Sequence, residues 1–380
     1  MNKTLNEKKK LIIVSNTAWY IYNFRLDLLY LILNKNYELH IVCPKDKYTA
    51  KLVNLGFLVY EWGLNRNSIN PLSEILSICK LMQFYMRIKP DIVHHFTIKA
   101  CFYGSICSLL CRTKNIINCF TGLGHLFIST GKKIRLIRKL ILPFSRFIFL
   151  NKKVKTVFQN NSDREYLLNL KLIKNSNSYV IPGSGVDINY FKPIKKKRNS
   201  KSLSLLFPSR IIKEKGIIEL ITAIDLIDKE NIPIKLYIAG RIDKGNRSCI
   251  TVKEERILKK QKNIIMLGHL EDIRTIYKDI DIVILPSWRE GLSKSLLEAA
   301  AMGKAIITTN VPGCKEIVEH MKTGLLVKIE SPEELKKSIL KLYKNPKLTL
   351  ELGKSAREKV IKEFELKKIN NMTIDLYERY

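Results

Sequence analysis

Short β-rich apolar runs alternate with longer amphipathic stretches along this chain, and the alternation restarts after residue 200. The pattern is typical of parallel α/β domains, in which each buried strand is followed by a covering helix. The first series of predicted strands covers residues 11–15, 38–43, 91–96, 115–120, 154–159 and 178–183. The second series covers residues 203–210, 234–240, 263–268, 281–287 and 304–309. The sequence therefore predicts two α/β domains in succession.

The length of the chain agrees with this division. At 380 residues it exceeds one ordinary hydrophobic core, and two domains of roughly 150 to 200 residues each are expected. A segment rich in Pro, Gly, Ser and Lys, residues 182–200, separates the two series of strands. We expect a first domain over residues 1–184, a linker over 185–200, a second domain over 201–360 and a terminal helix over 361–380.

The charge balance restricts the partners of the chain. With 67 Lys and Arg against 35 Asp and Glu, the net charge is +32, which favours nucleic acid, an anionic membrane surface or a phosphorylated substrate. The eight cysteines form no CxxC pair and lie mostly in apolar runs, so we expect reduced core thiols and a cytoplasmic protein. The apolar run after the basic N-terminus is too short for a signal peptide, and none approaches a membrane span.

The stretch "DIVILPSWREGLSKSLLEAAAMG" (281–303) predicts a strand, a loop and a helix that begins beside the loop. A helix N-terminus at the carboxyl end of a parallel strand is suited to binding phosphate. Gly291 allows the backbone to approach a ligand closely, and we expect Ser293 to cap the helix. Glu298 then lies roughly 7 Å beyond a bound diphosphate, where a ribose would sit. Glu290, on the loop, would meet the group on the other side of the diphosphate.

A second pair of residues points to the same ligand. Arg210 ends the first strand of the second domain, and Lys215 stands at the entrance of the next predicted helix. Both cations can converge on the same phosphates. The sequence therefore predicts that two basic side chains contact the bound diphosphate.

The segment "EGLSKSLLEAAAMGKAIITTNVPGCKEIV" resembles the signature of family 4 glycosyltransferases, which are retaining enzymes of the GT-B fold. Their E-x7-E motif matches Glu290 and Glu298, and Arg210 and Lys215 fit their R-x4-K-G pattern; proline is usual where this chain has Ser293. The resemblance implies two Rossmann-like domains that face a cleft, with a C-terminal helix that crosses back to the first domain. It implies catalytic roles for Arg210, Lys215 and Glu290. The donor-binding residues that it implies are Glu298, Gly291, Leu292, Ser293, Lys294, Gly240, Arg241, His269 and His125.

The first domain is expected to bind the acceptor. Its first strand is followed by "SNTAWYIYNFRLDLL" without a G-x-G-x-x-G motif, so a dinucleotide site is not expected. We predict that acceptor-facing residues follow two of its strands. They are Asn16, Tyr22 and Arg25 after the first strand, and Thr97 and Lys99 after the third of the predicted series.

No metal or other cofactor is predicted. Asp279 and Asp281 match a D-x-D metal motif, but they stand at the amino end of the strand over 281–287, away from the edge at which ligands bind. His94 and His95 are adjacent on one predicted strand, so they point to opposite faces of the sheet.

Residues 131–155, "GKKIRLIRKLILPFSRFIFLNKKVK", have nine basic residues and no acid, interleaved with Ile, Leu and Phe. An apolar stripe with a basic edge is what a helix needs to lie in an anionic membrane surface. An ordinary basic helix and a nucleic-acid contact are the alternatives. The segment favours attachment to a membrane.

Four stretches resemble bacterial enzymes that extend undecaprenyl-diphosphate-linked sugars, and this resemblance covers nearly the whole chain. They are "IYNFRLDLL", "PKDKYTAKLVNLGFLVYEW", "FTGLGHLFISTGKK" and "VIPGSGVDINYF". The resemblance implies transfer of an N-acetylhexosamine, in α linkage, from a UDP-sugar to a polyprenyl-diphosphate-linked saccharide during surface polysaccharide or O-antigen assembly. It also implies a peripheral position on the inner face of the cell membrane and no nucleic-acid partner. The alternatives are a GT-B sugar-nucleotide epimerase, which needs no membrane helix, and a basic nucleic-acid-binding protein, for which no module is evident.

Overall fold

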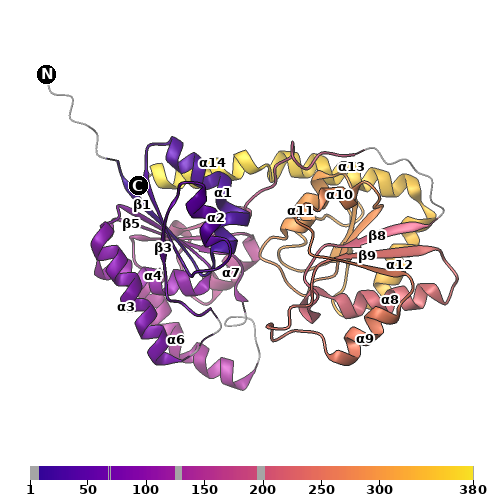
Figure 1. Ribbon diagram of the computed structural model, residues 1–380, viewed down its shortest axis with the longest axis horizontal. Coiled ribbons are helices and arrows are strands. Elements are labelled where there is room, and N and C mark those ends of the chain that lie inside the picture. The colour runs from indigo at the N-terminus through magenta and orange to yellow at the C-terminus, as the bar shows by residue number, and fades with distance from the viewer. Residues whose placement is uncertain (1–7, 67, 69, 125–130, 195–201, 380) are drawn as a thin grey trace. The chain divides into compact units, whose positions relative to one another are not determined.

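The computed structural model describes residues 8–66, 68, 70–124, 131–194 and 202–379. The chain divides into two compact units, of which the first runs to Ser184 and takes in the residues from Ile369 onward. The second unit runs from Gly185 to Lys368. Each unit is built around one parallel β-sheet, as the alternation in the sequence predicted (Figure 1).

The first unit contains a seven-stranded sheet in the order β3-β2-β1-β4-β5-β6-β7. Its strands are β1 Lys10–Ser15, β2 Glu38–Cys43, β3 Leu58–Glu61, β4 Ile92–Phe96, β5 Asn115–Phe120, β6 Val154–Phe158 and β7 Ser178–Val180. Its α-helices are α1 Ala18–Asn34, α2 Thr49–Asn54, α3 Pro71–Ile88, α4 Ile98–Leu110, α6 Lys132–Phe149, α7 Asn161–Asn169 and α14 Leu366–Glu378, with a 3₁₀ turn η1 at Asn175–Asn177. All the strand pairings are parallel.

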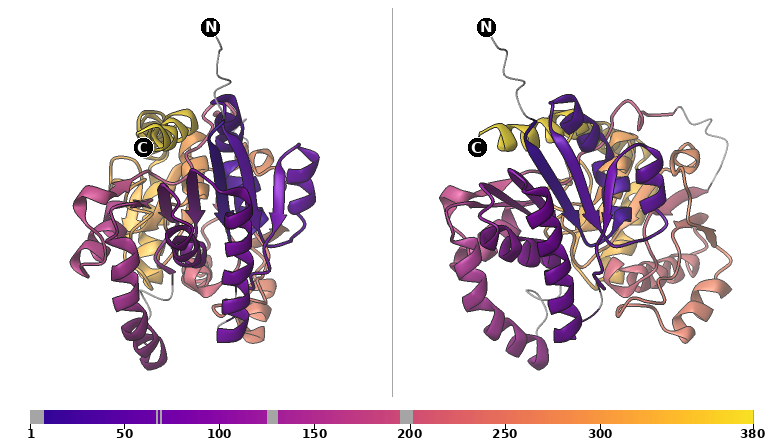
Figure 2. Two further views of the ribbon diagram at one scale, coloured as in Figure 1. Left: turned by 90° about the vertical axis from the view of Figure 1, so that its left-hand side faces the viewer. Right: turned by 60° about the vertical axis from the view of Figure 1, so that its left-hand side comes forward.

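Both faces of this sheet are buried, which explains the continuous apolar runs of its strands. Along β1, Leu11 and Ile13 pack with α1, α2 and α14 on one face. Ile12 and Val14 pack with α3, α4, α6 and α7 on the other face (Figure 2). The unit is therefore a three-layer α/β/α sandwich.

The C-terminal helix α14 is tied into the core of the first unit. Tyr377 is buried, and its hydroxyl shares a hydrogen bond of 2.5 Å with Nδ1 of His94 on β4. Burial lowers the pKa of His94 well below its usual range, so the imidazole is neutral. At the surface, Lys35 and Glu378 form an ion pair. The expected return of the chain to the first domain is thus seen in specific contacts.

The second unit contains a six-stranded parallel sheet in the order β10-β9-β8-β11-β12-β13. Its strands are β8 Leu203–Phe207, β9 Ile234–Ala239, β10 Ile264–Gly268, β11 Ile282–Leu285, β12 Ala305–Thr309 and β13 Leu325–Val327. Its helices are α8 Ile217–Asp228, α9 Val252–Lys260, α10 Arg274–Tyr277, α11 Lys294–Ala301, α12 Pro332–Lys344 and α13 Pro346–Glu363, with a 3₁₀ turn η2 at Lys213–Lys215. One hydrophobic core joins the sheet to these helices.

Candidate functional site

The strand order of the second sheet reverses between β8 and β11, which lie side by side. In open parallel sheets this switch point opens a crevice at the carboxyl ends of the strands, and ligands bind there. The loop after β8 contains Arg210 and Lys215, and the loop after β11 contains Glu290. The fold therefore places the three predicted catalytic residues on the two loops that flank the switch point.

Glycine shapes the loop after β8. Gly216 has a left-handed backbone, with φ of 72°, at the start of α8. A Cβ atom at this position would collide with the backbone carbonyl of Pro286, which follows β11. The two loops can approach only because residue 216 has no side chain. This close approach brings Lys215 next to the loop that carries Glu290.

Lys215 and Glu290 form an ion pair in which Nζ lies 2.5 Å from Oε1. The hydroxyl of Ser287 donates to the same carboxylate oxygen at 2.8 Å. The side chains of Lys215 and Glu290 are only 18% and 13% exposed, so the pair is sheltered from water. A fixed, sheltered ammonium at a switch point is suited to stabilising the charge of a departing phosphate. Ser287 is a member of this group that the sequence did not indicate.

Arg210 also has an acidic partner, which the sequence did not reveal. Its Nη1 donates to Oδ2 of Asp243 at 2.6 Å, and its side chain is 56% exposed. Asp243 lies in the loop after β9, and that loop is joined to the segment after β8 by main-chain bonds, among them Ile211 N–H to the Arg241 carbonyl. Two cations at the switch point are thus held in place by carboxylates.

The start of α11 differs from the expectation in one respect. Ser293 is the N-cap residue, but its side chain caps no backbone amide; its hydroxyl lies near that of Ser295 instead. The predicted side-chain cap is therefore wrong. The loop is held through its backbone, because the N–H of Glu290 donates to the Pro312 carbonyl and the N–H of Ser293 donates to the Gly313 carbonyl. A Cβ atom at Gly313 would collide with the Glu290 backbone, so glycine is required there.

Glu298 lies in the second turn of α11, on the same helix as Lys294. Burial raises the pKa of Glu298 to about 7, and Asp272 contributes in the same direction, while Lys294 opposes the shift. The carboxyl group is thus poised between its neutral and ionised forms near neutral pH. Gly291 and Leu292 precede it in the loop and are half-buried.

Three further residues of this unit are predicted to bind the donor. Gly240 follows β9, and a Cβ atom there would collide with the Ser209 carbonyl, so the loops after β8 and β9 also meet at a glycine. Arg241 comes next and is exposed, and His269 follows β10 and is exposed as well. All three stand at the carboxyl edge of the sheet. His125, the remaining residue assigned to the donor, lies outside the described residues.

The first unit has its own switch point, between β1 and β4. Asn16 follows β1 and Thr97 follows β4, so both predicted acceptor residues lie there. The side-chain oxygens of Ser15 and Thr97 are buried and have no hydrogen-bond partner within the described part of the chain. An unpaired buried hydroxyl calls for an explanation. Since ligands bind at switch points of parallel sheets, a polar ligand there would supply the missing partner. Thr97 also has a φ of 80°, unusual for a residue with a β-branched side chain.

Arg25 does not line this edge, contrary to the prediction. Its guanidinium is buried, donates to the Tyr20 hydroxyl through Nε and Nη2, and donates to the Gly183 carbonyl at 3.2 Å. It also packs over the ring of Phe96. A buried arginine with these partners joins α1 to the end of the first unit. Its role is structural.

Lys99 and Tyr22 are also predicted to face the acceptor. Lys99 forms an ion pair with Glu74 of α3 and donates to the carbonyl of Asn65, so its ammonium already has partners. Tyr22 is half-buried and contacts the ring of Tyr48, with the Lys51 ammonium above it. The structure therefore brings Asn16 and Thr97 to the switch point, and gives Lys99 a contact that an acceptor would have to replace.

The two adjacent histidines lie on opposite faces of the sheet, as predicted. His94 contacts Tyr377, whereas His95 is bound between Tyr85 and Asn118 at 2.7 Å each. Asp281 accepts a bond from the Ser204 backbone at the amino end of β11. Across the described ranges, no three His, Cys, Asp or Glu side chains are grouped to hold a metal ion.

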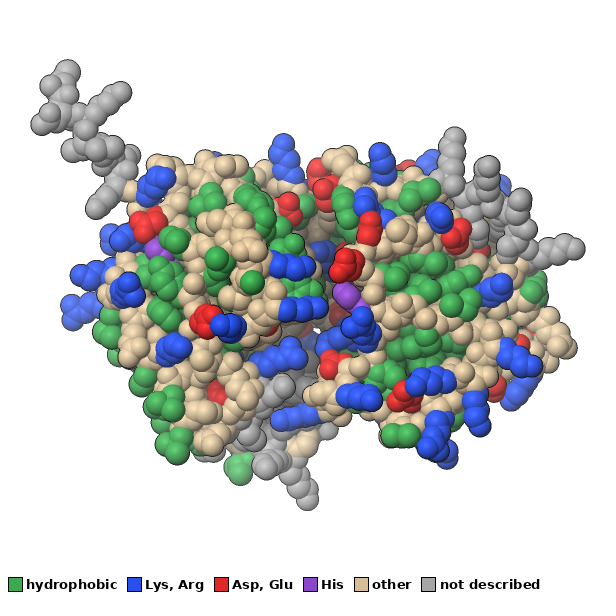
Figure 3. All heavy atoms as spheres, in the orientation of Figure 1, with side chains coloured by type: hydrophobic (Ala, Val, Ile, Leu, Met, Phe, Trp, Pro, Cys, Tyr) green, Lys and Arg blue, Asp and Glu red, His purple; other side chains and the backbone are tan. Residues whose placement is uncertain are grey.

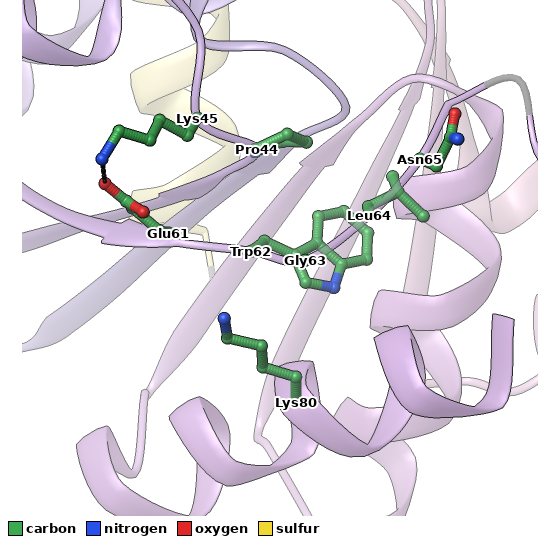
Figure 4. A pocket seen from close by; sticks show the side chains of 8 residues that line it. All are labelled: Pro44, Lys45, Glu61, Trp62, Gly63, Leu64, Asn65 and Lys80. Atoms are coloured by element: carbon green, nitrogen blue, oxygen red, sulfur yellow. Dashed lines mark ion pairs between the residues drawn. The ribbon is translucent and has the colours of Figure 1, made fainter. Parts of the chain in front are cut away.

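A hollow of about 330 Å³ lies at the carboxyl ends of β2 and β3 in the first unit. Figure 4 shows the side chains that line it, with the Lys80 amine rising from α3 toward the loop after β3. Lys45 and Glu61 form an ion pair of 3.1 Å at its rim, and the Trp62 indole donates to the Ser77 carbonyl. This hollow could not be predicted from the sequence, because the loop residues that line it form no motif.

The basic segment forms the helix α6, which ends at Phe149 and not at residue 155, because Leu150 closes it and Val154 begins β6. Leu136, Phe144 and Phe147 on this helix are exposed. Among the helices that the structure describes, none has the length and apolarity to cross a bilayer.

Two family models match the chain. The model "Glycosyl transferase 4-like" matches residues 10–159, and "Glycosyl transferases group 1" matches residues 191–359. The match to the first model begins with β1 and runs through the strands of the first unit to β6. The match to the second includes the sheet of the second unit and its switch point.

Known proteins resemble the chain over nearly its full length. It is 27% identical to the N,N'-diacetylbacillosaminyl-diphospho-undecaprenol alpha-1,3-N-acetylgalactosaminyltransferase of Campylobacter jejuni, over 96% of this chain and 97% of the relative. It is 25% identical to the UDP-Gal:alpha-D-GlcNAc-diphosphoundecaprenol alpha-1,3-galactosyltransferase of Escherichia coli, over 91% and 90%. The Anabaena protein HepE, solved with UDP and glucose, superposes with a TM-score of 0.79 at 16% identity, covering 97% of this chain and 99% of that one. The chain thus belongs to the group 1 and family 4-like glycosyltransferases and is a glycosyltransferase of the GT-B fold.

Proposed function

We propose that the enzyme transfers an N-acetylhexosamine from a UDP-sugar to an undecaprenyl-diphosphate-linked saccharide, with retention and in α linkage. The use of a UDP-sugar donor is supported by the sheltered Lys215–Glu290 ion pair at the switch point, with Arg210 on the same loop as Lys215. The use of an undecaprenyl-diphosphate-linked acceptor is supported by the two relatives described above, whose names both include a diphospho-undecaprenol sugar. Assembly of a surface polysaccharide or O-antigen is the corresponding process.

The cations would act on the leaving group. As the bond between the anomeric carbon and the diphosphate oxygen breaks, negative charge gathers on the phosphate, and Lys215 and Arg210 stabilise it. The acceptor hydroxyl attacks from the same face, and its proton passes to an oxygen of the departing phosphate. The route requires no divalent cation and no protein nucleophile, because side chains provide the positive charge.

Donor binding would rearrange the two ion pairs. A diphosphate carries more charge than the carboxylates of Glu290 and Asp243, and it can accept bonds from Lys215 and Arg210 together. Glu290 is then released from Lys215 and can accept hydrogen bonds from the hydroxyls of the donor sugar. Glu298, farther along α11, accepts from the ribose, and the loop residues from Gly291 to Lys294 surround the diphosphate.

Asn16 and Thr97 are the residues we retain for the acceptor, together with Tyr22. Asn16 and Thr97 stand at the switch point of the first sheet, beside the unpaired hydroxyl of Ser15. Lys99 can contribute only if the acceptor diphosphate displaces Glu74 from its ammonium. Arg25 is excluded because it is buried.

Helix α6 would hold the enzyme on the inner face of the cell membrane. Leu136 and Phe147 are 62% and 74% exposed, and basic residues are interspersed with these apolar side chains. Such a helix binds an anionic surface through both apolar insertion and charge. The lipid-linked acceptor would then be anchored in the same membrane as the enzyme.

A donor screen tests this function. The enzyme is incubated with lipid extracts that contain polyprenyl-diphosphate saccharides and with single UDP-sugars, and the lipid products are read by mass spectrometry. We expect the mass of one N-acetylhexosamine residue to be added. Formation of an epimerised UDP-sugar without any acceptor would contradict the proposal and would favour an epimerase of the same fold.

The pKa of Glu298 predicts how nucleotide binding depends on pH. If the carboxylate is the form that accepts the ribose hydroxyls, the neutral form below pH 7 must lose a proton before it can bind. We expect the affinity for UDP to fall about tenfold from pH 8 to pH 6, as one ionisation near pH 7 requires. Isothermal titration calorimetry with UDP measures this change. Glu298→Gln should remove most of the dependence, and an equally steep dependence in that variant would contradict the assignment.

A further inference from the structure

Helix α3 has an apolar surface on the side that faces away from the sheet. Its inner side packs into the core through Leu81, Tyr85 and other buried residues. On the outer side, Leu72, Ile75 and Leu76 are 73%, 56% and 69% exposed. Spacings of three and four residues place these three side chains together on one turn of the helix. A soluble helix would ordinarily expose polar residues there.

The exposed positions of α3 include basic residues but no acid. Glu74 is the only acidic residue of α3, and it is turned inward, where it binds Lys99 and the Tyr103 hydroxyl. Arg87 is exposed farther along the helix, and Lys80 is exposed too, although its amine is turned toward the hollow after β3. The sequence then has no Asp or Glu between Asp91 and Asp163, a range that includes all of α4 and α6. The surface is therefore both apolar and positively charged.

Helices α3 and α6 belong to one layer. Both cover the same face of the first sheet, with α4 between them (Figures 1 and 2). Each follows a strand of a parallel sheet, so both helices begin at the carboxyl edge of that sheet. Leu72, Ile75 and Leu76 lie in the first turns of α3, and Leu136 lies in the second turn of α6. Figure 3 shows hydrophobic side chains exposed over this part of the unit.

We propose that α3 is a second membrane-contacting element, in which Leu72, Ile75 and Leu76 enter the acyl region of an anionic bilayer beside α6. The inference rests on the proposed action at a membrane and extends it to a helix outside the basic segment. Two apolar helix ends at the same edge of the sheet would fix the orientation of the protein on a flat membrane. With one helix alone, the protein could rotate about the axis of that helix. The lack of exposed acid favours an anionic bilayer over a basic or neutral protein partner.

Two groups of variants separate the contributions of the two helices. Leu72→Ser, Ile75→Ser and Leu76→Ser together remove the apolar contact of α3 and leave the charge unchanged. Arg135→Glu, Arg138→Glu and Lys139→Glu together reverse charge on α6. Leu350→Ser, which changes an equally exposed leucine of α13 in the second unit, is the matched control. Circular dichroism confirms that each variant is folded.

Cosedimentation with phosphatidylglycerol-containing vesicles is measured at low and high salt without any sugar nucleotide. Salt screens charge but not apolar insertion. We expect the α3 variant to lose the salt-resistant part of binding, with a partition coefficient lowered by roughly 10²-fold. The α6 variant should lose mainly the salt-sensitive part, and the control should bind like the wild type. Since no donor is present, a failure of the proposed transfer leaves this readout unaffected.

A fluorescent probe locates α3 directly. Cys79 is the exposed cysteine of the chain and lies one turn beyond Ile75 and Leu76. An environment-sensitive label on Cys79 should shift to shorter wavelengths on vesicles and be quenched by brominated acyl chains, and Cys79→Ser gives the background. Wild-type binding by the α3 variant together with an unshifted label would overturn the proposal. Dimerisation that the α3 variant abolishes, with vesicle binding unchanged, would also overturn it and would show that α3 contacts a second copy.

Discussion

Replacing Lys215 with alanine is expected to lower the rate of sugar transfer by roughly 10²-fold or more, by analogy with the loss of one oxyanion donor. The ammonium is sheltered and already positioned at the switch point, so a water molecule cannot replace it in the same geometry. Steady-state kinetics with the donor and acceptor identified by the screen measures the loss. In the proposed mechanism side chains supply the positive charge, so addition of EDTA should leave the wild-type enzyme active.

Lys213→Ala is the matched control for this variant. Lys213 lies two residues away in the same 3₁₀ turn, but its ammonium pairs with Glu254. The Lys213→Ala variant should therefore keep nearly the full rate of sugar transfer. Glu290 loses its partner in Lys215→Ala, so the thermal midpoint of each variant is compared to exclude a loss of folding. Strong inhibition by EDTA that Mn²⁺ restores would show that a metal offsets the leaving-group charge, against our proposal.

The strands of both sheets could be predicted largely from the sequence, because burial on both faces requires uninterrupted apolar runs. The predicted ranges 38–43 and 115–120 coincide with β2 and β5. The sequence did not reveal β3 or β13. Both are short edge strands, and β3 is partly exposed, so neither has the long apolar run that marks a central strand.

The order of strand, loop and helix predicts that Arg210, Lys215 and Glu290 lie at the carboxyl edge of the second sheet, and the structure places them on the two loops there. Their assignment to a donor site came from the resemblance to family 4 glycosyltransferases and stays a prediction. The ion pairs of this site could not be predicted from the sequence. The partners of Arg210 and Lys215 are Asp243 and Glu290, which are far away in the sequence and come close only when the loops after β8, β9 and β11 meet. These meetings depend on glycines such as Gly216 and Gly240, at which a side chain would collide with backbone.

Arg25 shows that the direction of a long side chain could not be predicted from the sequence. An arginine in the first helix after a parallel strand is in a suitable place to bind a ligand, and the local sequence does not reveal that the side chain is buried. Its direction is set by the Gly183 carbonyl, 158 residues away, and by the hydroxyl of Tyr20. Local spacing predicts which edge of the sheet a residue occupies. It does not predict whether a long side chain points outward to a ligand or inward to the core.

The two carboxylates of the donor site should respond differently to removal of their charge. Glu290→Gln is expected to lower kcat by roughly 10²-fold, because in the proposed mechanism the carboxylate interacts with the donor sugar as that sugar gains positive character in the transition state. The same change frees Lys215 from its competitor, so UDP itself should bind at least as tightly as to the wild type. Glu298→Gln should instead weaken UDP binding and change kcat little, since contacts to ribose persist through the reaction.

Calorimetry with UDP and steady-state kinetics, applied to both variants, distinguish these outcomes. Glu351→Gln, an exposed glutamate on α13, serves as the control and should match the wild type in both measurements. The ion pair therefore predicts a combination that proximity to the donor alone would not: Glu290→Gln slows turnover but does not weaken the binding of the product UDP. Weaker UDP binding by Glu290→Gln with an unchanged kcat would show that Glu290 holds the nucleotide and not the sugar, and the order of the two acids along the donor would have to be reversed.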